Sequence, residues 1–457
     1  MDGLQASVEK MRADEVSDAA IETFRDLYTR WQDGETGLLP ESEIEPLGDL
    51  PSLDALPEPG DDAHAALDAT VVLKLNGGLG TSMGMTKAKS LLEVKDGLTF
   101  LDVIARQVLD ARRRLGVRLP LVLMNSFATR DDSLEALSRI EGLASDVPAD
   151  FVQSKEPKIV ADDGAPVSWP DNPGLEWAPP GHGDVYPSLV GSGMLDALLE
   201  RGYRYLFMSN SDNLGAVLDP RILAWIAREE IPFLSEVADR TEADRKGGHL
   251  AVRRSDGGLV LRESAQVPDD DAGAFGDISR HTFFNTNNLW VDLRALKAVM
   301  AERGGVMGLP MIVNRKTVDP NDSGSTPVVQ LETAMGAAVG VFDGARALRV
   351  PRTRFAPVKT TSDLLVLRSD AYELTGDARL VLAESRSDAP LVALDDAYYK
   401  RLRDFDERFA AGAPSLIEAE RLKVVGDVTF GAGVVVKGSV TVEGPSVLDD
   451  GTVLEGG

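Results

Sequence analysis

The pattern of apolar and polar positions divides the 457-residue chain into parts of different character. Residues 1 to about 45 carry apolar side chains at helical spacing, which predicts a pair of packing helices. Residues 46–64 combine proline, glycine and a run of acids, which predicts a linker. From about residue 70, apolar runs alternate with amphipathic segments; they predict strands over 70–75, 119–126, 205–209, 232–237, 250–253 and 282–291, with helices such as 100–109 and 194–201 between them. This alternation indicates a doubly wound α/β sheet, whose ligands lie at the carboxyl ends of the strands.

The last thirty residues follow a different period. Val428, Val434 and Val440 are six residues apart, and Val447 and Val453 continue the spacing after one inserted residue. This pattern resembles the hexapeptide repeat of a left-handed β-helix, and an irregular β-meander is the alternative. The repeat continues to the last residue, so its end is a candidate surface for assembly of a homo-oligomer. The predicted domains are therefore 1–68, 69–370 and 371–457.

Composition narrows the class of protein. Hydrophobic residues make up 43% and charged residues 27%, as in ordinary globular proteins. No apolar run approaches the ~20 residues of a membrane span, and the acidic N-terminus is unlike a secretory signal. The absence of cysteine excludes disulfides and thiolate metal sites. These features predict a cytoplasmic location, and the net charge of −26 argues against nucleic acid and anionic membranes as partners.

A glycine-rich segment follows the first predicted strand of the sheet. The strand ends in the sequence Asn76-Gly77-Gly78-Leu79-Gly80-Thr81, and Lys87 and Lys89 follow closely. Glycines leave backbone N–H groups open to a ligand, so these donors and the two ammonium groups predict a polyphosphate site. The spacing fits neither the P-loop nor the GxGxxG pattern, and a glycine-rich turn without a ligand is the alternative. Because the chain is acidic, such a site needs local positive charge and would benefit from a divalent cation.

Polar groups also follow two later apolar or proline-rich stretches. Two prolines precede Gly181-His182-Gly183-Asp184, which presents a histidine on a tight loop and favours a ligand contact. A helix expected from about Ser188 would offer its N-terminus to an anion. The strand at 205–209 delivers Asn210, Asp212 and Asn213 at its end. Asp212 either caps the next element or holds a divalent cation.

Two further segments suit a sugar phosphate. Asn285 and Asn287 have period-two spacing on a predicted strand, so they share one face, and paired amides suit sugar hydroxyls. Lys359 lies between Pro357 and a hydroxyl-rich turn, with another apolar strand expected after it.

These motifs together resemble a known enzyme family. LNGGLGTSMG, FVQSKEPKI, PPGHGD, SNSDNLG, FNTNNLW and PVKTTSDLL occur in the order found in the eukaryotic-type UTP–glucose-1-phosphate uridylyltransferases. The similarity runs from about residue 70 to the C-terminus and includes VVQLETAMGAA at 328–338. It implies an α/β nucleotide-diphospho-sugar transferase core, Rossmann-like with a mixed, mostly parallel sheet, preceded by variable helices and followed by a C-terminal left-handed β-helix.

The resemblance also implies an activity and a set of site residues. The activity is transfer of uridylyl from UTP to glucose 1-phosphate, giving UDP-glucose and pyrophosphate, with Mg²⁺ as cofactor. On the nucleotide side it implicates Leu75, Asn76, Gly77, Gly78, Lys89, Gln153, Gly181 and Asp212. On the sugar-phosphate side it implicates His182, Asn210, Asn285, Asn287 and Lys359, with Asp212 at the metal and Lys89 and Lys359 as catalytic lysines. The chain departs from the family once, where the usual Cys-Lys-Gly-Pro-Lys is Met85-Thr86-Lys87-Ala88-Lys89.

The expected mechanism follows from charge. A sugar phosphate has a second pKa of about 6 and is mainly a dianion at neutral pH, so it needs no general base. Its oxygen would attack the α-phosphorus of UTP in line, and Lys89, Lys359 and Mg²⁺ would offset the repulsion between anions. Three alternatives remain. The first two are a pyrophosphorylase for another UDP-sugar, such as an N-acetylhexosamine or galactose, and a catalytically silent nucleotide-sensing regulator. The third, a hexapeptide acyltransferase, is disfavoured by the few coils and by the lack of a histidine after His281.

Overall fold

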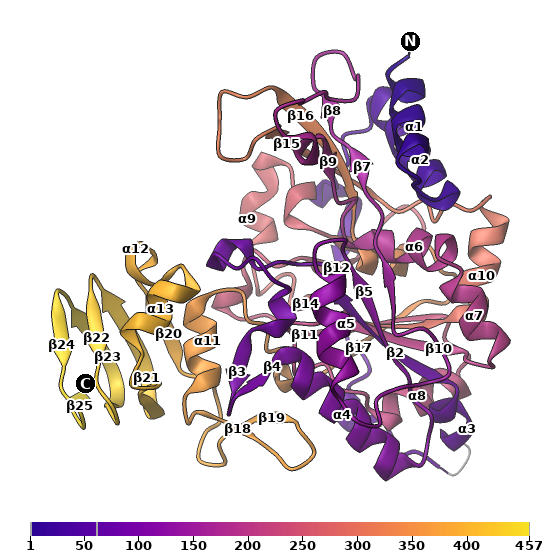
Figure 1. Cartoon of the computed structure of the whole chain (residues 1–457). Coiled ribbons are helices and arrows are strands. Elements are labelled where there is room, and N and C mark those ends of the chain that lie inside the picture. The colour runs from indigo at the N-terminus through magenta and orange to yellow at the C-terminus, as the bar shows by residue number, and fades with distance from the viewer. Residues whose placement is uncertain (1, 61–62, 457) are drawn as a thin grey trace.

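The computed structural model describes residues 2–60 and 63–456, and its centre is a ten-stranded mixed sheet (Figure 1). The strand order along the sheet is β1-β12-β14-β10-β2-β5-β6. Its parallel core consists of β2 (Thr70–Asn76), β5 (Leu121–Asn125), β6 (Asp150–Val152) and β10 (Tyr205–Asn210). The predicted Rossmann-like core with a mainly parallel sheet is therefore confirmed.

The remaining strands extend the sheet beyond β10. β14 (Phe283–Asp292) runs antiparallel to β10, and β11 pairs β14 and β17. The other strands on this side are β1 (Ile44–Pro46), β11 (Phe233–Asp239), β12 (His249–Arg253), β13 (Leu259–Arg262) and β17 (Arg346–Arg349).

Helices cover both faces of the sheet, and the alternation of side chains along the strands explains why. On β2, Val72 faces one core cluster, whereas Val71 and Leu73 face the other. The first face carries α3 (Ala63–Asp68), α4 (Phe100–Leu115), α5 (Arg130–Ser138), α8 (Pro220–Arg228) and α11 (Thr361–Arg368). The second face carries α6 (Val185–Gly191), α7 (Met194–Glu200) and α10 (Leu293–Glu302). A strand buried on both faces is rich in apolar residues along its whole length, as β5 is, and as β2 is except at Lys74.

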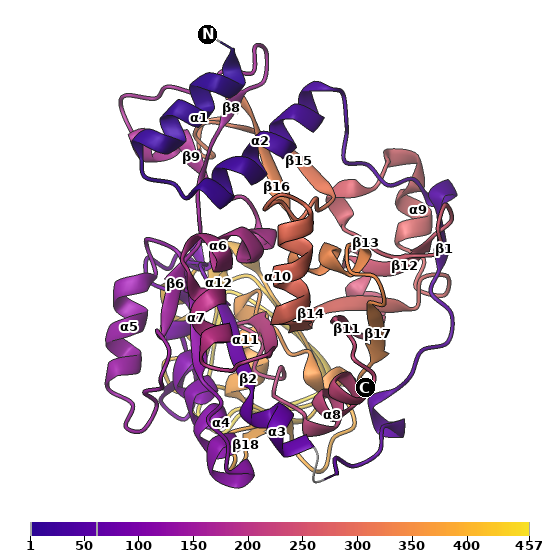
Figure 2. The same ribbon diagram turned by 90° about the vertical axis from the view of Figure 1, so that its right-hand side faces the viewer.

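A smaller lobe stands beside the sheet (Figure 2). Its three-stranded sheet has the order β15-β16-β8, and α1 and α2 pack on it through a separate apolar cluster. The elements of this lobe are α1 (Gly3–Ala13), α2 (Asp18–Gln32), β7 (Glu156–Pro157), β8 (Ile159–Val160), β9 (Trp177–Ala178), β15 (Met311–Thr317) and β16 (Pro327–Thr333).

The helical prediction for residues 1 to about 45 is correct only as far as Gln32. Gly34 and Gly37 adopt φ of +90° and +71°, and the chain then runs to the sheet edge, where β1 pairs β12. Within the predicted linker, Leu53–Ala55 form a 3₁₀ turn and α3 begins at Ala63, while Asp61 and Asp62 lie outside the described residues. The domain boundaries at 68 and 370 stay a prediction.

The C-terminal part forms stacked parallel strands. Its four-stranded sheet has the order β20-β21-β23-β25, and β22 pairs β24 beside it. Val428 pairs Ser446 and Val435 pairs Val453, so successive rungs are 18 residues apart, or three hexapeptides. The part comprises β18 (Tyr372–Leu374), β19 (Leu380–Leu382), β20 (Leu391–Leu394), α12 (Asp396–Tyr399), α13 (Leu402–Arg408), β21 (Ser415–Val425), β22 (Val428–Phe430), β23 (Val435–Glu443), β24 (Ser446–Leu448) and β25 (Val453–Glu455). The parallel strands are established, whereas the left-handed sense of the coil stays a prediction.

Short elements complete the molecule. They are the hairpin of β3 (Glu93–Lys95) and β4 (Leu98–Thr99), and α9 (Ala272–Phe275). In the part of the chain that the structure describes, no helix is long and apolar enough to cross a membrane.

Candidate active site

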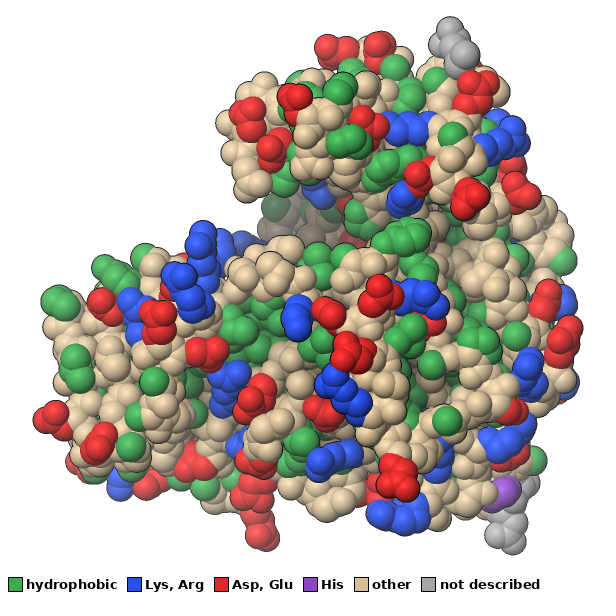
Figure 3. Space-filling model, viewed as in Figure 1, with side chains coloured by type: hydrophobic (Ala, Val, Ile, Leu, Met, Phe, Trp, Pro, Cys, Tyr) green, Lys and Arg blue, Asp and Glu red, His purple; other side chains and the backbone are tan. Residues whose placement is uncertain are grey.

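A cavity of about 340 Å³ lies at the carboxyl ends of β2 and β10. It adjoins the junction between sheet and lobe, since Gln153 follows β6 toward β7 and Pro179–His182 lead from β9 to α6. The predicted site residues that line it are Leu75, Gly77, Gly78, Lys89, Gln153, Gly181, His182, Asn210 and Asp212. In the space-filling view a recess separates the lobe from the body of the molecule (Figure 3). Six separate segments of the sequence thus meet where a doubly wound sheet binds its ligands.

The glycine loop is shaped by close contacts. A Cβ atom on Gly77 would lie 2.5 Å from Oε1 of Gln153, so only glycine lets this amide approach the loop. Gly80 and Gly84 have φ of +63° and +73°, and the Lys89 backbone N–H donates to the carbonyl of Gly78 at 3.0 Å. The loop therefore folds back on itself and returns Lys89 to the cavity.

The expectation that Lys87 and Lys89 converge is wrong for Lys87. Lys87 is exposed and lines two other hollows, because the chain turns at Gly84 and again at the 3₁₀ turn that begins with Lys89. Where the sequence departs from the family, Met85 packs its sulfur against Gly80, and Ala88 is fully buried. These two side chains fill the space around the loop.

The side chain of Asn76 points away from the cavity. Its Nδ2 donates to Asn125 Oδ1 at 2.7 Å and to Ser133 Oγ at 2.8 Å beneath the sheet edge. The side chain is almost completely buried, so the prediction that Asn76 binds the nucleotide is wrong for its side chain. Asn76 instead ties β2 to β5 and α5.

Lys89 and Asp212 form an ion pair across the cavity. Lys89 Nζ lies 2.7 Å from Asp212 Oδ2, and the two side chains are 17% and 21% exposed. Lys89 comes from the glycine loop and Asp212 from the end of β10, so one contact joins two motifs. Within residues 2–60 and 63–456, no group of three or more His, Asp or Glu side chains is arranged to hold a metal ion. Asp212 is thus a single carboxylate that could serve as one metal ligand among others.

His182 is held as a neutral imidazole. Its Nδ1 accepts the Met335 backbone N–H at 2.9 Å, and burial lowers the pKa of His182 to about 4. Because Nδ1 is an acceptor, the proton resides on Nε2, and the ring can donate a hydrogen bond without carrying charge.

The segment after His182 differs from the prediction. α6 begins at Val185, so Ser188 lies inside the helix, where its hydroxyl donates to Asp184 Oδ2 at 2.7 Å. Asp184 also accepts the Ser154 backbone N–H at 2.6 Å, and burial raises the pKa of Asp184 to about 6. This carboxylate therefore fixes the His182 turn to the segment that carries Gln153.

Asn285, Asn287 and Lys359 lie outside the lining of this cavity. Asn285 Nδ2 donates to Asn287 Oδ1 at 2.8 Å, so the predicted pairing of the two amides is present on β14. Lys359 is exposed, and its neighbour Val358 donates its N–H to the carbonyl of Asp212 at 3.3 Å. The Lys359 segment is thus attached to the loop that carries Asp212.

The strand expected after Lys359 is a helix. α11 starts at Thr361, and Thr360 and Asp363 form a reciprocal capping box at its N-terminus. A Thr-x-x-Asp capping box before an apolar run is a helix-start signal, and the prediction overlooked it.

Sequence reasoning also missed Glu263. This residue follows β13, and a Cβ on Gly248 would lie 2.5 Å from its Oε2. The carbonyl of Gly248 accepts the N–H of Asn285 at 2.9 Å, so Glu263 neighbours the amide pair. Burial raises the pKa of Glu263, and Lys359 opposes the shift. A lone glutamate after an unpredicted strand gave no signal in the sequence.

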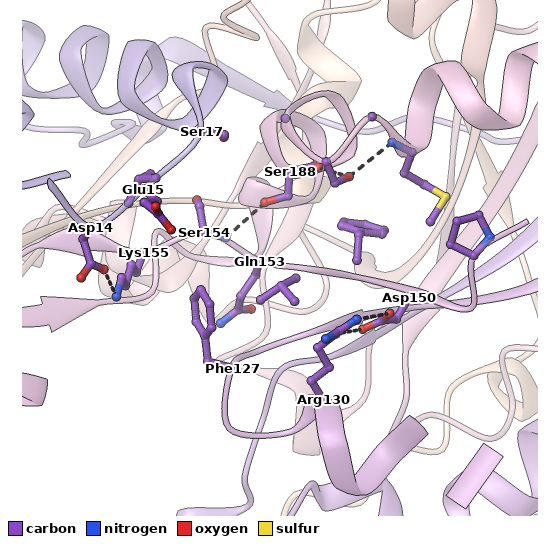
Figure 4. A pocket seen from close by; sticks show the side chains of 18 of the residues that line it. Asp14, Glu15, Ser17, Phe127, Arg130, Asp150, Gln153, Ser154, Lys155 and Ser188 are labelled. Carbon is purple, nitrogen blue, oxygen red and sulfur yellow. Dashed lines mark hydrogen bonds and ion pairs between the residues drawn. The ribbon is translucent and has the colours of Figure 1, made fainter. Parts of the chain in front are cut away.

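A second cavity of about 460 Å³ lies against the turn between α1 and α2 (Figure 4). Four of its five charged side chains form ion pairs: Lys155 with Asp14, and Arg130 with Asp150 at 2.8 Å. Of the predicted site residues only Gln153 lines it, so the smaller cavity is the candidate active site.

Comparison with known proteins agrees with this geometry. A family model described as UTP–glucose-1-phosphate uridylyltransferase matches residues 21–437. The enzyme of that name from Solanum tuberosum is 42% identical over 452 residues, covering 96% of this chain and 92% of the relative. The one from Encephalitozoon cuniculi is 39% identical over 405 residues, covering 88% and 79%.

Solved structures show the same fold. The UDP-glucose pyrophosphorylase from Leishmania major matches with a TM-score of 0.94 and 48% identity, over 100% of this chain and 98% of that one. A protein from Trypanosoma brucei, described as a UDP-glucose phosphorylase, matches with a TM-score of 0.89 and 46% identity over the full length of both chains. Family model, relatives and structures thus agree over nearly the whole sequence, including every motif that meets at the cavity. The chain belongs to the UTP–glucose-1-phosphate uridylyltransferase family.

Proposed function

We propose that this chain transfers uridylyl from UTP to glucose 1-phosphate, releasing UDP-glucose and pyrophosphate. The observation that carries the proposal is the cavity at the ends of β2 and β10, where the glycine loop, Gln153, His182 and the Lys89–Asp212 pair meet. Its volume of about 340 Å³ lies in the range of small-molecule sites. Membership of the family supports both substrates.

The nucleotide would occupy the side of the cavity formed by the glycine loop. Leu75 and Gly77 would lie at the base and ribose, and the Gln153 amide, which touches Gly77, would bind uracil. Lys89 would meet the phosphates, since it points from the loop toward Asp212. Gly78 and Gly181 would let backbone atoms approach the ligand.

The sugar phosphate would lie on the opposite side. The neutral His182 offers Nε2–H to a phosphate oxygen, and Asn210 lies at the end of β10 beside it. The amide pair of Asn285 and Asn287, with Glu263 next to it, would accept and donate hydrogen bonds to the glucose hydroxyls. Each Asn oxygen already accepts one hydrogen bond within the segment, so Glu263 adds a further acceptor for the sugar hydroxyls.

Catalysis would consist of positioning and charge stabilisation. The sugar-phosphate dianion needs no general base, so no residue has to remove a proton. Lys89 would offset negative charge at the phosphates, and Lys359 would approach from the segment that is attached to the Asp212 loop. Both lysines would act most strongly as charge grows on the departing pyrophosphate.

The residues present fit a Mg²⁺ ion that is completed by substrate. Asp212 supplies one carboxylate, and Mg²⁺ is commonly held by one or two carboxylates together with phosphate oxygens. When bound, the ion would neutralise charge on the triphosphate. Lys89 pairs with Asp212 in the ligand-free protein, so it would keep this carboxylate neutralised and oriented until nucleotide arrives.

Three further expectations stay predictions. The 18-residue rungs of the C-terminal strands support a left-handed β-helix. Val447 and Val453 on its last coil are 74% and 52% exposed, which supports a contact between copies there. A Val447→Glu, Val453→Glu variant that sediments like the wild type would contradict this contact. A cytoplasmic location rests on the sequence alone: the lack of a membrane-length apolar run, the acidic N-terminus and the absence of cysteine.

A pyrophosphate-release assay with UTP and a panel of sugar 1-phosphates tests the proposed function. Glucose 1-phosphate should support turnover best, while the N-acetylglucosamine and galactose compounds test the alternative UDP-sugars. Binding of UTP without release of pyrophosphate from any sugar phosphate would instead indicate a silent regulator.

A further inference from the structure

Lys74 is a buried lysine in the middle of the parallel sheet. It lies on β2 between the apolar Leu73 and the site residue Leu75, and it is 1% exposed. Its Nζ donates to Ser209 Oγ at 2.7 Å and to the backbone carbonyl of Ala216 at 2.9 Å. Its stem points into the same core cluster as Val72 and Phe207, and Nζ lies 5.7 Å from the Phe207 ring centroid.

This position is unfavourable for a lysine. Burial of an ammonium group without a paired carboxylate costs several kcal/mol, and among the described residues no carboxylate forms an ion pair with Lys74. An apolar side chain of the same length would suit the surrounding leucine, valine and phenylalanine better. The amine must therefore supply something that an apolar residue cannot.

The two acceptors of Lys74 bracket a functional loop. Ser209 is the last buried residue of β10 before Asn210, and Ala216 closes the turn that follows Asp212. The amine thus joins the beginning and the end of the segment that carries both polar site residues. A neutral amine has two N–H donors, so both contacts persist when the ammonium loses its proton.

The other side of this loop is held by Asn213. Its Oδ1 accepts the backbone N–H of Ala356 at 2.9 Å, and its Nδ2 donates to the carbonyl of Arg354 at 3.1 Å. These contacts tie the loop to the segment that leads to Lys359. Lys74 holds the same loop from β2, the strand that leads into the glycine loop and Lys89. The loop is therefore fixed relative to both proposed catalytic lysines, Lys89 and Lys359.

We propose that Lys74 is a positioning residue for uridylyl transfer, holding the Ser209–Ala216 loop so that Asn210 and Asp212 face Lys89. The inference rests on the proposed function, because it assigns a role in that reaction. Lys74 touches no substrate, and its effect passes through Ser209 and Ala216 alone.

The test replaces Lys74 with methionine, which keeps the length of the side chain and removes the amine. Lys74→Met should unfold near the wild-type temperature, since the loss of a buried charge offsets the loss of the hydrogen bonds to Ser209 and Ala216. Its kcat should nevertheless fall ten- to a hundredfold, because small displacements of positioned groups cost about this much, while KM for UTP changes less than threefold. A lysine with only a structural role would move activity and melting temperature together.

Lys158→Met is the matched control. Lys158 is also buried, at 6% exposure, and its Nζ donates to the carbonyl of Val318 at 2.8 Å in the small lobe, away from the Asp212 loop. This variant should keep kcat within twofold of the wild type. An equal loss of kcat in Lys158→Met and Lys74→Met would overturn the proposal.

Ser209→Ala provides a second route that leaves the lysine in place. It removes one of the two acceptors and should lower kcat at least threefold. The double variant should be no slower than Lys74→Met, because Lys74→Met already removes the contact between Lys74 and Ser209. If Lys74→Met does not fold, Ser209→Ala is the test, and an unchanged kcat in Ser209→Ala contradicts the proposal.

Wild-type turnover is measured first, because it separates the two proposals. No pyrophosphate release by the wild type would refute the proposed function. Normal wild-type turnover together with a fully active, folded Lys74→Met would refute only the role of Lys74.

Discussion

Replacement of Lys89 by methionine is the sharpest perturbation of the proposed active site. Methionine keeps the apolar stem and length of the side chain, so the glycine loop should retain its shape while the charge disappears. Lys89 Nζ lies 2.7 Å from Asp212 Oδ2 in the free protein. The change therefore removes the cation and also leaves a carboxylate unpaired where phosphates are expected to bind.

The size of the effect follows from Coulomb's law. One unit charge about 4 Å from a developing negative charge, at an effective dielectric constant of about 20, contributes roughly 4 kcal/mol. An interaction of that size that is realised only in the transition state corresponds to a change in kcat on the order of a thousandfold. The Lys89–Asp212 pair is partly exposed, so its loss should change the free energy of unfolding by only about 1 kcal/mol.

Lys87→Met is a matched control because it removes the same charge two residues away. Lys87 is exposed and lies outside the candidate active site, so this variant should keep kcat within twofold of the wild type. Steady-state pyrophosphate release from both variants, with thermal melts to confirm folding, distinguishes the two lysines. Refutation would come from a folded Lys89→Met that retains a tenth or more of the wild-type kcat, or from an equal loss in Lys87→Met.

Three further predictions concern other charged groups of the protein. Lys359→Ala should lower kcat by a similar factor with little change in melting temperature, and near-wild-type turnover would remove Lys359 from the mechanism. Glu263→Gln should raise KM for glucose 1-phosphate several-fold while leaving KM for UTP unchanged; equal changes in both constants would contradict a position at the sugar. Burial, with Arg354 nearby, lowers the pKa of Lys74 to about 7. Above pH 7 the folded chain therefore releases a proton that the unfolded chain keeps up to about pH 10. Because the unfolded chain binds more protons in this range, the free energy of unfolding rises with pH. Urea unfolding of wild type and Lys74→Met should therefore show the wild type gaining about 2 kcal/mol on the variant between pH 7 and pH 9, and a constant difference would refute the lowered pKa.

The sheet could be predicted from the sequence because its central strands are buried on both faces. β5 and β10 are nearly continuous apolar runs, and β2 is apolar except for Lys74 and its ends. Polar residues follow each strand at once, so both the strands and the candidate ligand-binding edge are visible in the sequence. The cavity accordingly contains most of the predicted residues.

Errors arose where local chain geometry decides the outcome. Lys87 and Lys89 look equivalent in sequence, but the turn at Gly84 sends only Lys89 into the cavity. The apolar run after Lys359 has strand-like composition, but the capping box of Thr360 and Asp363 starts a helix there. The spacing of apolar residues alone does not reveal such hydrogen bonds between side chains and the backbone.

Other features depend on contacts between distant segments. Glu263 lies beside Gly248, near the Asn285–Asn287 pair, because β12 and β13 pair. Lys74 gave no signal, because a single polar residue inside an apolar strand does not indicate what its amine will meet. Both residues became interpretable once the tertiary structure placed their partners.

We expect the cavity at the ends of β2 and β10 to perform uridylyl transfer to glucose 1-phosphate. Incubation of the purified full chain with UTP, glucose 1-phosphate and Mg²⁺, with product nucleotides separated by chromatography, tests it most directly. The wild type should form equal amounts of UDP-glucose and pyrophosphate, and both should be lost in Lys89→Met but not in Lys87→Met. Formation of no UDP-glucose by the folded wild-type chain, or equal formation by Lys89→Met, would contradict it.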